Sequence, residues 1–147
     1  MAWAVWRELR RRPHIDLTFA DVTGARGICV DGGDGRRIVI LDHRLDQRHR
    51  RAVLAHELVH DERGLLFDDD TPIGIVRKEE AIVDAITAAR LVPLDDLADF
   101  LTRSDGGVTA TDVADEFDVP VDVAVRAIRL LEQRTRHAGH PSLRQFR

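Results

Sequence analysis

The stretch His56-Glu57-Leu58-Val59-His60 decides how the rest of the chain can be arranged. On an α-helix, residues four apart lie one above the other, with about 5–6 Å between their Cβ atoms, so both imidazoles can reach one metal ion. Glu57 then lies beside that ion, where a carboxylate can act as a catalytic base. The stretch therefore predicts a metal-binding helix. The competing interpretation is a surface helix with two solvated histidines.

The flanking residues favour a helix here. Asp46 is a suitable N-cap, Arg50 to Ala55 contain no helix breaker, and Gly64 is suited to end the helix. The buried face of this helix is predicted to consist of its apolar side chains, Val53, Leu54, Leu58 and Val59.

A catalytic zinc ion needs a third protein ligand besides the two histidines and keeps one open position for water. Glu79 and Glu80 are the nearest candidates, on a second helix predicted from Arg77 to Leu91. Glu80 is favoured because Asp84 follows one turn later, where its carboxylate can accept the outer N–H of a ligand histidine. Glu79 has Val83 at that offset, which cannot do so. The sequence therefore predicts Glu80 as the third ligand.

These motifs resemble those of the ImmA/IrrE family of small gluzincin-type zinc metallopeptidases. The resemblance covers about residues 27 to 93 well and continues more loosely to about Leu131. It is carried by His56-Glu57-Leu58-Val59-His60, Glu80-Ala81-Ile82-Val83-Asp84-Ala85 and Ala88-Ala89-Arg90-Leu91-Val92-Pro93. Two departures, Val83 for the usual Ala and Ile86-Thr87 for a Phe-Ala pair, change packing and leave the ligands alone.

Carried over by position, the resemblance implies a zinc-dependent endopeptidase. Its zinc ligands would be His56, His60 and Glu80, with Glu57 as the base and Asp84 as the carboxylate that supports a ligand histidine. Members of this family cleave a helix-turn-helix transcriptional repressor, so the implied substrate is a cytoplasmic protein of that class. Related peptidases stabilise the oxyanion with a Tyr or a His.

That last role has no clear candidate in this sequence. The chain contains no tyrosine. His43 or an arginine can substitute, but nothing in the spacing selects one of them, so the role is left unassigned.

Length and composition predict a soluble globular protein. The 147 residues are 44% hydrophobic and 33% charged, with a formal net charge of −4 that gives no overall attraction to nucleic acid or to an anionic membrane. Cys29 is the only cysteine, which favours a reducing compartment. The first residues lack a signal-peptide pattern, and no apolar run is long enough to span a membrane. We expect a cytoplasmic protein; its oligomeric state is left open.

The N-terminal third predicts a helix followed by a small sheet. The helix extends from Met1 to Arg11, and the basic run from Arg10 to Arg12 is expected to be solvated at its C-terminal end. Three strands are predicted, at residues 14–22, 27–30 and 37–41, with a glycine-rich turn that makes the last two a hairpin. A phosphate-binding loop is disfavoured because no Lys-Ser/Thr follows and a strand takes the place of a helix.

The C-terminal part predicts three more helices, at residues 94–102, 109–117 and 120–135. The last two resemble a helix-turn-helix, with Arg126, Arg129 and Gln133 on one side of the second. DNA binding is nevertheless disfavoured, because residues 109–147 carry six Arg against six Asp/Glu and lack the clustered cations that bind phosphates. Packing against the catalytic helices, or docking a substrate protein, is favoured instead.

The predicted fold class is α+β, with a small N-terminal sheet of about three strands packed on zincin-type active-site helices, followed by a C-terminal helical, helix-turn-helix-like part. We predict a catalytic core at residues 1–93, a helical subdomain at 94–135 and a flexible tail at 136–147. The alternative functions are a DNA-binding regulator and a metal-bearing interaction module without turnover.

Overall fold

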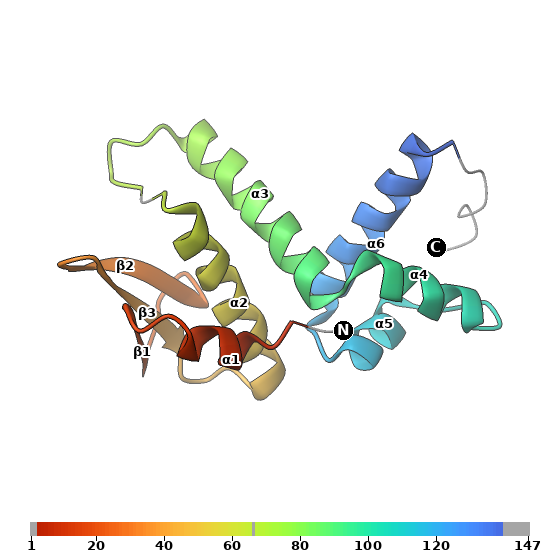
Figure 1. Ribbon diagram of the computed structural model, residues 1–147, viewed down its shortest axis with the longest axis horizontal. Helices are drawn as coiled ribbons and strands as arrows, with labels where there is room; N and C mark the ends of the chain where they lie inside the picture. The colour runs from red at the N-terminus through yellow and green to blue at the C-terminus, as the bar shows by residue number, and fades with distance from the viewer. Residues whose placement is uncertain (1–2, 66, 140–147) are drawn as a thin grey trace. The chain divides into compact units, whose positions relative to one another are not determined.

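A three-stranded sheet forms the first layer of the structure, a computed structural model that describes residues 3–65 and 67–139. Its strands are β1 (Ile15–Ala20), β2 (Gly27–Gly33) and β3 (Arg36–Asp42), in the spatial order β1-β3-β2 (Figure 1). β2 and β3 form the predicted antiparallel hairpin, whose turn residues Asp34 and Gly35 both have positive φ angles, 53° and 75°. β1 pairs with β3 in parallel, which needs a crossover connection.

The helix that carries the histidines, α2 (Gln47–Arg63), packs against this sheet. Val39 and Leu41 of β3 are fully buried, and the register pairs Leu41 with Gly27 of β2. A Cβ atom added at Gly27 would lie 2.6 Å from Cγ1 of Val53, so a glycine is needed for this close approach of strand and helix. Leu54, Leu58 and Val59 of α2 are also fully buried, as predicted.

Both ends of α2 lie where the sequence predicts them. The Asp46 carboxylate accepts a hydrogen bond of 2.8 Å from the backbone N–H of His49. Gly64 adopts the left-handed conformation, with φ 72° and ψ 2°, and its N–H donates to the carbonyl of His60. Each contact satisfies a backbone group that a helix end leaves unpaired.

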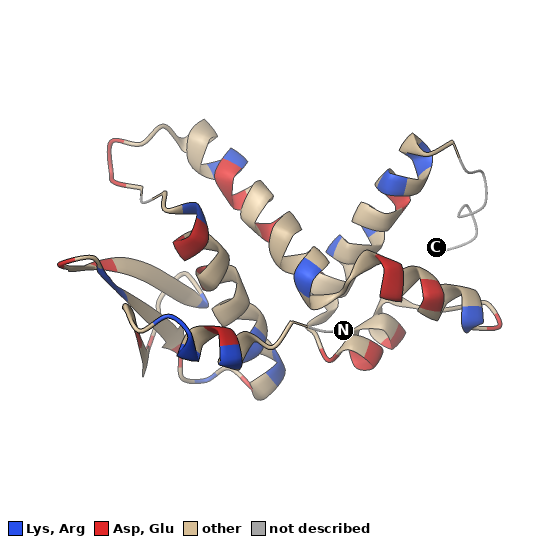
Figure 2. Ribbon diagram, viewed as in Figure 1, with Lys and Arg blue, Asp and Glu red and all other residues tan. Residues whose placement is uncertain are grey.

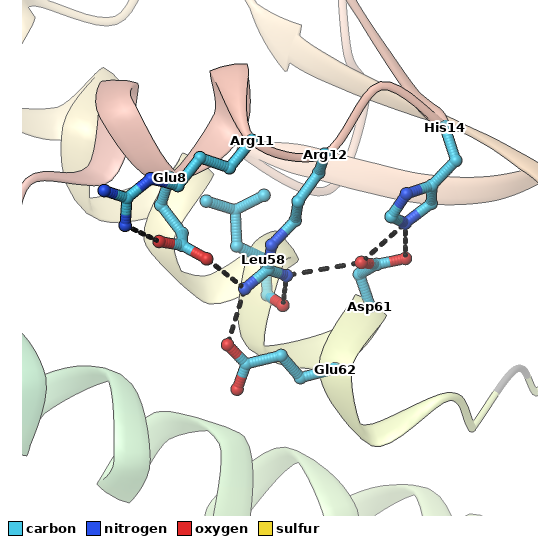
Figure 3. Close-up of polar contacts among 7 residues, drawn as sticks. All are labelled: Glu8, Arg11, Arg12, His14, Leu58, Asp61 and Glu62. Carbon is cyan, nitrogen blue, oxygen red and sulfur yellow. Dashed lines mark hydrogen bonds and ion pairs between the residues drawn. The ribbon is translucent and has the colours of Figure 1, made fainter.

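The N-terminal helix α1 (Val5–Arg10) is held against α2 by Arg12, which lies two residues beyond the end of α1. The Arg12 guanidinium donates to the carbonyl of Leu58 at 2.8 Å and contacts the carboxylates of Glu8, Asp61 and Glu62 at 3.2, 3.2 and 2.5 Å (Figure 3). Arg12 is only 9% exposed. The prediction of a solvated basic run is therefore wrong for this residue.

The helix that carries Glu80, α3 (Ile73–Leu91), begins four residues before the predicted start at Arg77. Ile73 and Ile75 in its first turn are 64% and 55% exposed. Because these two apolar side chains lie outside a buried helical face, the sequence pattern does not show the first turn, and it underestimates the length of the helix.

Three helices follow, α4 (Leu94–Arg103), α5 (Ala110–Phe117) and α6 (Val121–His137). Thr109 and Asp112 form a capping box at the start of α5, and Asp118 ends that helix in the left-handed conformation. Acidic residues gather on α5 and in the first turn of α4, while α6 carries arginines toward its C-terminal end (Figure 2). The apolar core of these helices consists of Leu97, Leu101, Val113, Ala114, Val119, Ala124, Ala127 and Leu131.

The α+β class and the C-terminal helical part are thus confirmed. The structure divides into two compact units, residues 4–87 and a second unit that contains Trp3 and the described residues from Ala88 onward. The predicted domain boundaries stay predictions, and residues 140–147 of the predicted tail lie outside the described residues. Among residues 3–65 and 67–139, no helix combines the length and the apolar character needed to cross a bilayer.

Candidate metal centre

Two histidines on α2 form the first half of the centre. The Nε2 atoms of His56 and His60 lie 3.0 Å apart, and their rings are inclined to each other by 71°. The helical repeat brings the two rings to the same face of α2, one turn apart. Both side chains are mostly buried, with exposed fractions of 22% and 12%.

Glu80 on α3 supplies the second half. Its Oε2 atom lies 3.2 Å from Nε2 of His56, and its Oε1 atom lies 2.9 Å from Nε2 of His60. Among the described residues, these three side chains are the group whose ligand atoms could hold a metal ion, with all of them within 4.8 Å of one another. The structure therefore brings together the three side chains that the sequence singles out.

The donor set and its spacing fit zinc. Bond lengths of about 2.0–2.2 Å and tetrahedral angles place the ligand atoms of a zinc ion about 3.3 Å apart. The distances among the two imidazole nitrogens and the carboxylate oxygens, 2.9 to 3.2 Å, are close to that value. Two imidazoles and one carboxylate leave a fourth position for water, as catalytic zinc sites do.

Asp84 contacts the ring nitrogen of His56 that does not face Glu80. Its Oδ1 atom lies 3.1 Å from Nδ1 of His56, on the side of the ring opposite the Nε2 that faces Glu80. Burial alone would lower the pKa of His56, but the hydrogen bond with Asp84 and the nearby carboxylates raise it. A proton kept on Nδ1 leaves the lone pair of Nε2 directed at the metal position.

His60 has the opposite electrostatic balance. Burial lowers its pKa, and the neighbouring His56 lowers it further. A lowered pKa favours the neutral imidazole, which is the form that binds a metal ion.

Glu57 lies within α2 next to His56 and is only 5% exposed. Burial raises the pKa of its carboxyl group to about 7; His56 opposes this rise and Glu80 adds to it. A carboxyl group with a pKa near neutrality can both accept and return a proton at physiological pH.

One ion pair beside the centre is not predicted from the sequence. The Glu79 carboxylate, 7% exposed, makes a two-pronged ion pair with the guanidinium of Arg63 at the end of α2; the Nη2–Oε2 distance is 3.0 Å and the Nε–Oε1 contact is the closer one. From the sequence, Glu79 is a candidate only for the third metal ligand. A signal was available, because Arg63 lies one turn beyond the second histidine, on its side of the helix.

His43, a candidate from the sequence for stabilising the oxyanion, pairs with Asp21. Its Nε2 atom lies 2.5 Å from Oδ1 of Asp21, and its side chain is 52% exposed. The oxyanion role therefore stays unassigned.

Comparison with known proteins relates the chain to a peptidase family. A peptidase family model, described as the IrrE N-terminal-like domain, matches residues 10–129, a span that begins in α1 and ends within α6. No curated protein matches the chain.

Proposed function

The chain belongs to the family of IrrE N-terminal-like peptidase domains, and from this premise we propose that it is a gluzincin-type zinc endopeptidase with Glu57 as its base. The observation that carries the proposal is the convergence of His56, His60 and Glu80, whose ligand atoms lie 2.9 to 3.2 Å apart. Membership of a peptidase family implies a protein substrate. Zinc as the metal, and the role of each residue, are part of the proposal.

A zinc ion held by these three residues would polarise the scissile carbonyl and lower the pKa of its bound water to about 7. Glu57 then accepts the proton of the attacking water on its carboxylate and later transfers that proton to the leaving amine. Burial suits Glu57 to both steps, because it raises the pKa of the carboxyl group toward neutrality. Asp84 keeps the His56 ring in the ligand orientation throughout.

The variant Glu57→Gln tests this mechanism, because it keeps the shape of the side chain and removes the base. We expect zinc to bind in a stoichiometry of one, as in the parent protein, and peptide hydrolysis to fall by about 10²-fold or more. Hydrolysis is measured on a mixed peptide library by mass spectrometry, and zinc by atomic absorption. The control is Glu116→Gln on the exposed surface of α5, which should leave both unchanged. Full activity of Glu57→Gln would refute the mechanism.

We further propose that the substrate is a helix-turn-helix transcriptional repressor. The support is the family membership together with the resemblance to ImmA/IrrE proteins. The test is to incubate the zinc-loaded protein with the helix-turn-helix repressor encoded nearest to its gene. We expect one cut in the repressor, absent with Glu57→Gln or with a chelator. An intact repressor, under conditions in which library peptides are cleaved, would refute this substrate while leaving the peptidase proposal in place.

A further inference from the structure

The polar contacts between the two ligand-bearing helices follow an order. They run from Glu79–Arg63, through Glu80–His60, to Asp84–His56. Residue numbers rise along α3 as they fall along α2, so the two segments lie antiparallel. Of these three contacts, Glu79–Arg63 is therefore the one nearest to the C-terminus of α2.

Glu79 and Glu80 are consecutive and hold different parts of α2. With 3.6 residues per turn, neighbouring side chains on a helix diverge by about 100°. One carboxylate is bound to Arg63 and the other faces the two imidazoles. A helix held at two points that diverge in this way cannot rotate about its own axis without breaking one contact. The position of the Glu80 carboxylate therefore depends on where Glu79 is held.

The Glu79 contact is suited to this task. The guanidinium of Arg63 binds both carboxylate oxygens, a geometry that fixes direction as well as distance. The Glu79 side chain is 7% exposed, so water competes with this contact less than it would at the surface. The first turn of α3 offers little apolar support of its own, since Ile73 and Ile75 are exposed.

We propose that Arg63 and Glu79 are a positioning pair for the metal centre. Arg63 holds Glu79 so that the adjacent Glu80 lies within bonding reach of the ion, and it keeps Glu79 itself from binding there. In this role neither residue of the pair is a ligand of the ion. This inference rests on the proposed zinc centre of His56, His60 and Glu80.

The experiment measures zinc affinity by competition with a chromogenic chelator, for the full chain and its variants. Removing a residue that orients a metal ligand typically weakens affinity by about 10–100-fold. We expect a loss in that range for Arg63→Gln and for Glu79→Gln, and a smaller loss for Arg63→Lys, which keeps the charge without the two-pronged contact. The exchanged double variant Arg63→Glu with Glu79→Arg should recover much of the loss. The matched control is Arg36→Gln, which breaks an exposed pair with Asp16 and should bind zinc as the parent does.

Two further measurements, of folding and of zinc binding by His60→Ala, distinguish the possible outcomes. Circular dichroism of the zinc-free proteins shows whether each variant is folded, and Arg63→Lys serves if a glutamine variant is not. If His60→Ala binds zinc as well as the parent does, the proposed centre itself is wrong. If His60→Ala loses zinc while Arg63→Lys and Glu79→Gln stay within twofold of the parent, the centre stands and the positioning pair is refuted. Failure of the exchanged variant to improve on either single variant would also count against it.

Discussion

Among single residues, Arg12 supports the histidine helix on the side away from His56 and His60. Its guanidinium binds the carbonyl of Leu58, which lies inside the His56–His60 stretch, and the nearby Asp61 (Figure 3). Asp61 also contacts His14 at 2.9 Å and Arg37 at 3.1 Å. A buried cation thus ties the backbone of the predicted catalytic turn to the chain that leads into β1.

We predict that Arg12→Met lowers the free energy of unfolding by about 2–4 kcal/mol, because Asp61 and Glu62 lose a buried charged donor. The contacts of Asp61 with His14 and Arg37 keep the loss from being larger. Urea denaturation of the zinc-free protein measures it. Arg11→Met is the control, since the Arg11 side chain is 70% exposed and its removal should cost less than about 0.5 kcal/mol. Equal effects of the two substitutions would contradict this account.

A second prediction concerns Asp42 at the end of β3. Its carboxylate accepts hydrogen bonds from the Arg44 side chain at 2.6 and 2.9 Å and from the Arg44 backbone N–H, which hold the pKa of Asp42 well below its usual range. A pKa that is lower in the folded state stabilises the fold above the unfolded value of about 3.9. That contribution is lost as the pH falls from this value toward the lower folded pKa.

Unfolding curves of the parent and of Asp42→Asn, measured between pH 7 and pH 2, test this. We expect the parent to be the more stable protein at pH 7, and the difference to shrink steadily below about pH 4 as the Asp42 carboxylate of the parent is protonated. A difference that stays constant over this range would show that Asp42 does not titrate in the predicted way.

Among the elements, those defined by local signals could be predicted from the sequence. Asp46 and Gly64 mark the ends of α2, because a cap depends only on neighbouring residues. The start of α3 could not be found, since the exposed Ile73 and Ile75 in its first turn do not follow the spacing of a buried helical face. The parallel pairing of β1 with β3 could not be predicted from the sequence either, because the hairpin signal specifies only β2 as the antiparallel neighbour of β3.

The packing of β2 on α2 gives a prediction at this scale. Gly27→Ala would place a Cβ atom 2.6 Å from Val53 and 3.1 Å from the fully buried Leu41, so we expect a loss of about 1–3 kcal/mol in the free energy of unfolding. The side chain of Val53 is β-branched, so a change of its rotamer to avoid this contact would itself cost free energy. Gly74→Ala is the matched control: no atom lies within 4 Å of its added Cβ, and alanine in a helix should raise stability by about 0.5 kcal/mol. A neutral Gly27→Ala would mean that the strand and helix separate easily.

For the molecule as a whole, the sequence predicts more of the candidate metal centre than of the contacts that support it. His56, Glu57 and His60 lie within about one helical turn, and Asp84, four residues after Glu80, favours Glu80 over Glu79 as the third ligand. Arg12 was missed because its partners Leu58 and Glu62 lie 46 and 50 residues away, and Arg63 because Glu79 lies 16 residues away on another helix. Such pairs arise from tertiary packing, which no local pattern encodes.

The last prediction concerns how far zinc binding stabilises the chain. All proposed ligands belong to residues 4–87, so zinc should stabilise that unit by about 2.7 kcal/mol at a free concentration a hundred times its dissociation constant. If the helices from α4 onward unfold on their own, as the predicted division near Pro93 requires, zinc should leave their stability unchanged. Hydrogen exchange measured by mass spectrometry should then slow in α2 and in residues 73–87, and not in α4 to α6. His56→Ala removes the zinc effect and serves as the control. Equal slowing throughout the chain would show instead that the two units unfold together, and the predicted domain division would be wrong.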